Sequence, residues 1–296
     1  MAANCAWRRA AAADWPPYWY FRRKHAACHC FWSLMFSHYR NLFCAALALS
    51  WLMATGAGAG EFMLTFDDGP LPGATDKVLH ALEGLRAEDG QPVRAGFFLL
   101  GSIPDSMWER RKHYAPYEMW SGKGGLAAHP ELVRRILAAG HLVGNHSARH
   151  SWFRWPWLSD AEAVREEISA WEKPAAALLD PAAPRLFRPP YLVDTPAVRQ
   201  AAAEAGYQVV MGISSGDAAP LATPHAIVER VSGILGKWDQ AVPCVLVFHD
   251  TRPATQESLA EIVSALQERG FRLVHFDPAR LLAHDQRLAA QAAIQP

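Results

Sequence analysis

Two adjacent aspartates and two nearby histidines are the residues of this sequence best suited to holding a metal ion. Asp67 and Asp68 precede a Gly-Pro dipeptide, so a turn must hold two carboxylates close together. Their repulsion is tolerable only beside a cation or if one of them is protonated. His146 and His150 are four residues apart, a spacing that places both imidazoles on one face of a helical turn. Two histidines and one aspartate would form a metal site with positions open for water and substrate.

A histidine pair at this spacing is by itself more typical of surface or capping residues. Together with the paired aspartates, it favours a metal site instead. Other polar residues follow the ends of predicted strands: Arg188 ends the fourth, Asp217 follows the fifth, and His249-Asp250 follows the sixth. The carboxyl ends of parallel strands converge on one mouth of a barrel, where such folds place their active sites. We therefore expect these side chains to gather there. For Asp217 the alternative is a plain turn residue in Ser-Ser-Gly-Asp.

Short β-type runs alternate with helical stretches from residue 61 onward, which predicts an α/β fold. Helices are expected at 130–139, 160–171, 196–205, 224–235 and 255–269, from their prolines, capping residues and closing glycines. The second of these begins with a capping-box pair, Ser159 and Glu162. Seven β/α units predict a parallel sheet closed as a barrel. The predicted strands are 62–66, 95–99, 142–145, 186–188, 208–213, 244–248 and 271–275.

Charge and cysteine content exclude several classes of protein. Six of the 29 basic residues but only one of the 29 acidic residues lie in the first 60 positions, so the remainder is mildly acidic, which argues against nucleic acid as a partner. Four of the five cysteines lie in the same 60 positions. Cys244 is left alone in the body, which excludes a disulfide framework and cysteine ligands for zinc there. Cys28-His-Cys30 has no matching second pair.

Four motifs resemble those of the polysaccharide deacetylases of carbohydrate esterase family 4, the NodB-homology domain. They read TFDDGP at 65–70, HSARH at 146–150, RPPY at 188–191 and LVFHD at 246–250, in the family's order. The resemblance covers residues 61 to about 280. It implies a distorted seven-stranded (β/α) barrel with parallel strands, in agreement with the strand count.

The resemblance also implies a metal and a base. Asp68, His146 and His150 would hold a divalent ion, usually Zn²⁺, which polarises the acyl carbonyl and activates water. Asp67 would be the general base that takes the proton of the attacking water. Arg188 would pair with Asp67 and keep it ionised.

An oxyanion donor and an acid complete the implied set. The backbone N–H of Tyr191 would stabilise the tetrahedral oxyanion, and His249 would protonate the leaving amine with Asp217 orienting it. The sequence departs from the family pattern at two positions. Leu192 stands where glycine is common, and Ala218 stands where tryptophan usually follows the aspartate, which puts the shape of the substrate site in doubt more than the reaction.

Two aromatic segments are candidates for substrate contact. Residues 151–157, SWFRWPW, follow the second histidine directly, and Trp152 with Tyr191 is expected to bind sugar. The alternative is that these rings pack the barrel rim. The long insertion Ile103–Ala128 is predicted to form a lid or wall over the mouth, and its alternative is packing along the outer helices.

An apolar run near the start predicts export to the periplasm or the cell exterior. Leu42–Met53 has the length of a signal-peptide core and precedes a small-residue stretch. Cleavage after Ala59 would release a body that begins near Gly60. We divide the chain into a leader at 1–60 and a catalytic domain at 61–296. The alternative is an uncleaved membrane anchor, because the extended run approaches the ~20 residues that span a bilayer. Met35 is a second candidate for the start of translation.

Together these features predict a metal-dependent amidohydrolase that removes N-acetyl or related acyl groups from a sugar or polysaccharide, with an N-acetylated glycan as its partner. The first alternative is a deformylase or O-deacetylase acting on a lipid-linked or small sugar. The second is a homologue that binds glycan without turnover. Such a homologue would be expected to lose Asp67, Arg188 or His249, and all three are present.

Overall fold

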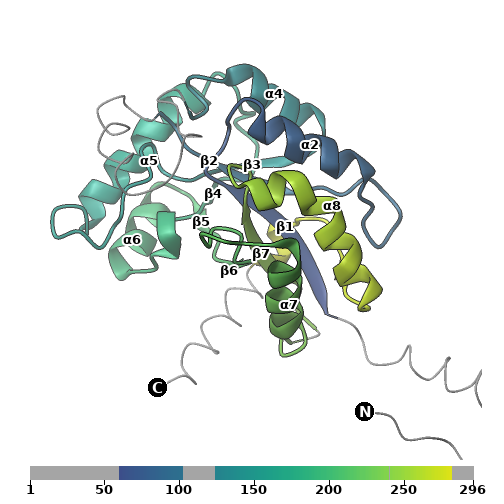
Figure 1. Ribbon diagram of the computed structural model, residues 1–296. Coiled ribbons are helices and arrows are strands. Elements are labelled where there is room, and N and C mark those ends of the chain that lie inside the picture. The colour runs from purple at the N-terminus through teal and green to yellow at the C-terminus, as the bar shows by residue number, and fades with distance from the viewer. Residues whose placement is uncertain (1–59, 103–123, 240, 282–296) are drawn as a thin grey trace, which may run out of the picture. The chain divides into compact units, whose positions relative to one another are not determined.

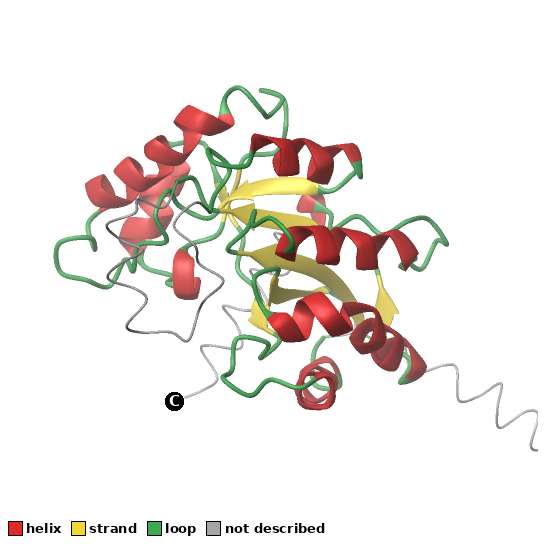
Figure 2. Ribbon diagram, turned by 45° about the horizontal axis from the view of Figure 1, so that its top comes forward, coloured by secondary structure: helices red, strands yellow, loops and turns green. Residues whose placement is uncertain are grey.

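The computed structural model describes residues 60–102, 124–239 and 241–281 (Figure 1). The described helices lie around the outside of a curved sheet (Figure 2). The strands are β1 (Glu61–Asp67), β2 (Gly96–Leu99), β3 (Leu142–Asn145), β4 (Leu186–Phe187), β5 (Gln208–Val209), β6 (Ile213–Ser214), β7 (Cys244–His249) and β8 (Arg272–Leu273). The helices are α2 (Ala74–Gly84), α4 (Pro130–Ala138), α5 (Ala161–Ala175), α6 (Pro196–Glu204), α7 (Pro224–Leu235) and α8 (Pro253–Glu268).

All strand pairs within the described sheet are parallel, and their order is β5-β4-β3-β2-β1-β7-β6. β1 lies near the middle and is buried along nearly its whole length, as expected for a parallel strand covered on both faces. β8 pairs with the first two residues of β1, whereas β2 pairs with the last three. β8 therefore joins the sheet only at the amino end of β1. The predicted α/β fold with a distorted parallel (β/α) barrel is confirmed.

The predicted strand 208–213 is wrong in one respect, because it is two short strands at opposite ends of the sheet. β5 pairs with β4, whereas β6 pairs with β7. The link 210–212 therefore crosses from one edge of the sheet to the other, and no pairing between β5 and β6 occurs in the described structure. A Cβ at Gly212 would lie 2.6 Å from Val247 Cγ2, so the link can pass this close to β7 only with glycine.

Five of the helices were predicted from their capping signals, to within a few residues at each end. One cap was assigned wrongly: Asp160 rather than Ser159 caps α5, with its side chain accepting a hydrogen bond from the Ala163 N–H at 2.8 Å. Sequence reasoning missed α2, because it begins after Gly73 in a left-handed conformation and has no Ser, Thr or Asn cap. Its buried residues Val78 and Leu82 had the required helical spacing.

Two predicted segments fall outside these residues. All of the leader 1–60 except Gly60, including its Leu42–Met53 run, and most of the insertion Ile103–Ala128 belong to the part of the chain that the structure does not describe. Among the helices that are described, none is both long enough and apolar enough to cross a membrane.

Candidate active site

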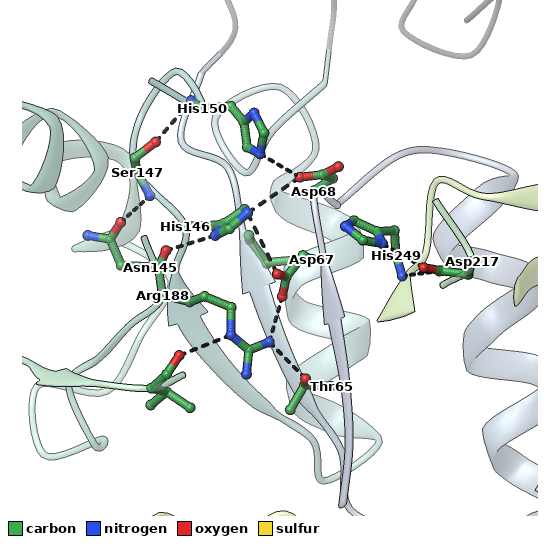
Figure 3. A network of polar contacts seen from close by, with 12 residues as sticks. Thr65, Asp67, Asp68, Asn145, His146, Ser147, His150, Arg188, Asp217 and His249 are labelled. Atoms are coloured by element: carbon green, nitrogen blue, oxygen red, sulfur yellow. Dashed lines mark hydrogen bonds and ion pairs between the residues drawn. The ribbon is translucent and has the colours of Figure 1, made fainter. Parts of the chain in front are cut away.

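The chemically interesting side chains lie at the carboxyl ends of the strands (Figure 3). Asp67, the last residue of β1, is the register partner of His249, the last residue of β7. On the other side of β1, β2 leads to β3, whose last residue Asn145 pairs with Phe187 just before Arg188. Parallel pairing thus brings four sequence-distant segments to one mouth, as expected from the barrel fold.

Asp68, His146 and His150 form a compact three-residue cluster in the described structure, and all three are buried. Their candidate ligand atoms lie within 4.8 Å of one another. Asp68 Oδ1 lies 3.4 Å from His146 Nε2 and 3.2 Å from His150 Nε2. Burial opposes ionisation, but the charge of nearby His150 lowers the pKa of Asp68 well below its usual value. This carboxylate is therefore ionised.

The hydrogen-bond pattern shows that a cation fits this cluster. His146 Nδ1 lies 2.8 Å from the carbonyl oxygen of Arg188. A carbonyl only accepts, so Nδ1 carries a hydrogen, and in the neutral imidazole that binds a metal Nε2 presents a lone pair toward Asp68. Asp68 Oδ1 is buried and accepts no hydrogen bond within the described residues. Two acceptors facing each other are stabilised by a metal ion between them, and one carboxylate with two imidazoles suits Zn²⁺.

The two histidines converge for a different reason from the one expected. Residues 146–150 form a bend rather than a helical turn, with Ser147 at φ 68° and His150 at φ 56°. Asn145 Oδ1 accepts a hydrogen bond from the Ser147 N–H at 2.7 Å, and Ser147 Oγ accepts one from the His150 N–H at 2.9 Å. These side-chain contacts stabilise the left-handed residues. The helical-turn argument was wrong, although the two side chains do meet.

Asp67 is held by a buried arginine. Arg188 is fully buried, and its Nη1 donates to Asp67 Oδ1 and to Thr65 Oγ1, both at 2.7 Å. Arg188 Nε donates to the carbonyl of Val210 at 3.1 Å, and the guanidinium lies 3.9 Å from the ring centroid of Phe98. Four contacts fix the guanidinium. The other oxygen of Asp67, Oδ2, is 3.8 Å from His146 Nε2 and so faces the metal cluster.

His249 and Asp217 form a second acid–base pair on the opposite side of the mouth (Figure 3). Asp217 Oδ1 lies 2.9 Å from His249 Nδ1, while Oδ2 accepts hydrogen bonds from the His249 N–H at 2.6 Å and from Thr255 Oγ1 at 2.7 Å. Burial lowers the pKa of His249, but the Asp217 carboxylate outweighs it and raises that pKa to about 10. The imidazole is therefore protonated at neutral pH, the state that a general acid requires.

Tyr191 and Leu192 occupy a tight turn beside the metal cluster. Both have left-handed backbones, with φ 58° and 52°, and the Tyr191 ring lies 4.5 Å from the His150 ring between centroids. A side chain in this conformation is strained and glycine is not, which accounts for the glycine that the family commonly has in place of Leu192. The use of the Tyr191 N–H as an oxyanion donor stays a prediction.

The aromatic segment after His150 divides between core and surface. Phe153 is fully buried, whereas the side chains of Trp152, Trp155 and Trp157 are 39%, 44% and 67% exposed. Packing of the barrel rim thus accounts for Phe153 and not for the three tryptophans. The sugar contact expected of Trp152 stays a prediction.

A buried contact between Asp250 and Thr75 lies under the aspartate turn, and the sequence had predicted no role for either residue. Asp250 is fully buried and accepts a hydrogen bond from Thr75 Oγ1 at 2.6 Å. Its carboxylate packs on the aspartate turn so closely that a Cβ at Gly69 would lie 2.2 Å from Asp250 Oδ2. Burial raises the pKa of Asp250 to about 7. The signal available in the sequence was the aspartate itself, standing directly after His249.

Comparison with known proteins agrees with this geometry. Residues 56–210 match the family model described as polysaccharide deacetylase. A chitooligosaccharide deacetylase of Bradyrhizobium sp. is 30% identical over 73% of this chain and 89% of its own length. A peptidoglycan-N-acetylglucosamine deacetylase of Bacillus cereus is 31% identical over 71% of this chain and 84% of its own. The solved family 4 carbohydrate esterase from Streptomyces lividans, in complex with acetate, superposes with a TM-score of 0.54 at 27% identity, covering 76% of this chain and 97% of that one.

Proposed function

The chain belongs to the polysaccharide deacetylase family, and from that premise we propose that it uses a divalent metal to hydrolyse N-acetyl groups on a glycan. One observation carries the proposal. A cluster of Asp68, His146 and His150 suited to a metal shares one mouth with an arginine-held carboxylate, Asp67, and a protonated imidazole, His249. A base and an acid beside a metal position are what hydrolysis of an amide needs.

The base side of the reaction belongs to Asp67. A divalent ion, when bound, polarises the acyl carbonyl and makes water a stronger nucleophile. Asp67 Oδ2 faces the cluster and is placed to accept the proton of the attacking water. Arg188 holds the other oxygen of the same carboxylate at 2.7 Å, which fixes the orientation of Asp67. Truncating this buried arginine would leave a buried charge unpaired, at a cost of about 3–5 kcal/mol.

The acid side belongs to His249. Expulsion of an amine from the tetrahedral intermediate needs a proton on nitrogen, because an amide anion is too poor a leaving group. Asp217 binds Nδ1 of His249, which leaves the Nε2–H to be donated. The N–H of Tyr191 is the donor we assign to the oxyanion, since such donors stabilise charge that develops in the transition state.

We propose that the substrate contains N-acetylglucosamine. The two relatives described above act, by name, on chitooligosaccharides and on peptidoglycan N-acetylglucosamine, which supports this class over a lipid-linked or small sugar. Ala218 in place of the usual tryptophan and the non-glycine Leu192 indicate a differently shaped pocket. A formyl or O-acetyl group is the alternative to be tested beside N-acetyl.

The decisive experiment is release of acetate by the purified protein from chitin oligomers, peptidoglycan, xylan and poly-N-acetylglucosamine. Removing metal with a chelator should abolish release, and adding Zn²⁺ should restore it. The Asp67→Asn variant is the matched control, since it keeps the predicted metal ligands. If the metal-loaded protein releases no acetate from chitin oligomers, peptidoglycan or poly-N-acetylglucosamine, the proposal is contradicted, and release from xylan alone would favour the O-acetyl alternative.

We also propose that the protein is exported, because Leu42–Met53 and the small residues after it have the pattern of a signal peptide. Expression from Met35 in a host with a general secretory pathway, followed by intact mass spectrometry, tests this. Export should give an N-terminus near Gly60. A protein outside the cytoplasm that still begins at Met35 would support an anchor instead.

A further inference from the structure

Three tryptophans directly after the metal cluster form an exposed surface of indole rings. Trp152, Trp155 and Trp157, here called the indole surface, are 39%, 44% and 67% exposed. The centroids of Trp152 and Trp155 are 5.3 Å apart with perpendicular planes, and those of Trp155 and Trp157 are 4.9 Å apart and stacked at 22°. Indole rings are normally among the more buried side chains. A contiguous group left in solvent indicates a binding surface.

The backbone under the indole surface is held in place. The Trp155 N–H donates to the carbonyl of Trp152 at 3.0 Å, and the Leu158 N–H donates to the carbonyl of Trp155 at 2.9 Å. Phe153 anchors the segment from below, fully buried with its ring 6.4 Å from that of Phe187. The exposed rings therefore belong to two successive turns fixed to the core. A ligand would find them already ordered, which lowers the entropy lost on binding.

The indole surface begins two residues after a ligand of the proposed metal. Only Ser151 separates Trp152 from His150, so their Cα atoms lie at most about 7.6 Å apart. The ring of Tyr191, itself 59% exposed, lies against His150. Exposed aromatic rings thus begin at the metal ligand and extend away from it along residues 152–157.

We propose that the indole surface binds sugar rings of the substrate chain beyond the acylated residue, so that the protein acts on oligomers and polymers in preference to mono- and disaccharides. This inference rests on the proposed function. A pyranose ring presents C–H groups on its faces and hydroxyls at its edge, which matches an indole with an apolar face and one polar N–H.

Trp157 is the residue to test, because it is the most exposed of the three and its loss should not damage the core. Trp157→Leu keeps an apolar side chain but removes the ring, whereas Trp157→Phe keeps a ring. For the N-acetylglucosamine hexamer, Trp157→Leu should lower kcat/KM about two- to tenfold, the effect of one aromatic contact. Trp157→Phe should restore most of that loss. The dimer and 4-nitrophenyl acetate should be hydrolysed at the parental rate by both variants.

Binding is measured separately, so that this inference and the proposed function can fail independently. Calorimetry with the hexamer on metal-loaded Asp67→Asn protein should show a weaker Kd when Trp157→Leu is added. An unchanged Kd and an unchanged ratio of hexamer to dimer kcat/KM would overturn the inference even if the enzyme is active. Equal losses on hexamer, dimer and aryl acetate would also overturn it. Binding of the parent, but not Trp157→Leu, to phosphatidylglycerol vesicles without any hexamer effect would assign the surface to a membrane instead.

Discussion

Replacing Asp217 with asparagine should turn His249 from a group that is protonated throughout the neutral range into one that titrates within it. The Asp217 carboxylate raises the pKa of His249 to about 10 against the opposing effect of burial. Asparagine has the same shape without the charge. The pKa of His249 in Asp217→Asn should therefore fall to about its ordinary value of 6.5 or lower.

The loss of activity can be worked out from this change. With a pKa of about 6.5, roughly three quarters of the imidazole is protonated at pH 6, about 3% at pH 8 and about 0.3% at pH 9. The wild type is protonated at all three. If the reaction needs the protonated form, the ratio of wild-type to variant kcat/KM should be near 1 at pH 6, about 30 at pH 8 and about 300 at pH 9. Taking the ratio at each pH cancels the titration of groups that both proteins share.

The assay is acetate release from an N-acetylglucosamine oligomer between pH 6 and 9, with metal content checked at each pH. Thr255→Val is the matched control, because it removes a 2.7 Å hydrogen bond to Asp217 but leaves the carboxylate charge. It should cost activity by the same small factor at every pH. A pH-independent loss in Asp217→Asn would refute the reasoning and make Asp217 a residue that only positions the imidazole.

Four further single variants test the rest of the site. Asp67→Asn should keep stoichiometric metal and lose about 10²–10⁴-fold in kcat; near-normal turnover by this variant would remove Asp67 from the role of base. His146→Ala and His150→Ala should each lose both bound metal, measured by plasma emission, and activity, whereas full occupancy in the double variant would exclude these ligands. Asp250, whose folded pKa of about 7 lies above its ordinary 3.8, should make the metal-free protein lose stability as pH rises from about 4 to 7, by about 1.4 kcal/mol for each pH unit within that range. In Asp250→Asn that fall should be absent from urea unfolding compared between pH 4.5 and pH 6, below the range in which the raised pKa of His249 also lowers stability, and an equal fall in both proteins would contradict the buried protonated carboxyl.

The parts of the fold that could be predicted were those with local signals. Proline and threonine at helix starts gave α6 and α7 because a Thr-Pro pair supplies both a cap and a preset φ. α2 lacked such a cap and was missed. The run 208–213 was apolar throughout most of its length, and local hydrophobicity cannot say which strand each half pairs with, so the division into β5 and β6 was not predictable.

The candidate site was predictable for its residue types and less so for its geometry. The two histidines and an aspartate were expected together because the carboxyl ends of parallel strands converge, and the family resemblance singled out Asp68, which the structure does bring beside His146 and His150. The reason offered, a helical turn, failed because Asn145 and Ser147 hold a left-handed bend through their side chains. Contacts such as Thr75 with Asp250 join residues 175 positions apart, and no local pattern reports them.

The link between β5 and β6 has a consequence for how this barrel tolerates change in length. Its first residue, Val210, accepts the hydrogen bond from Arg188 Nε, and the same guanidinium aims Asp67. Surface loops usually accept insertions at little cost, but this three-residue link, which the sequence predicted as the middle of a strand, is buried. A longer link would instead displace the Val210 carbonyl from Arg188, so that Arg188 would no longer hold Asp67 in one orientation, while the strands would stay paired. Variants with insertions at Met211 should therefore be recovered as folded, metal-binding and inactive proteins, and natural variation in chain length is expected elsewhere on the barrel.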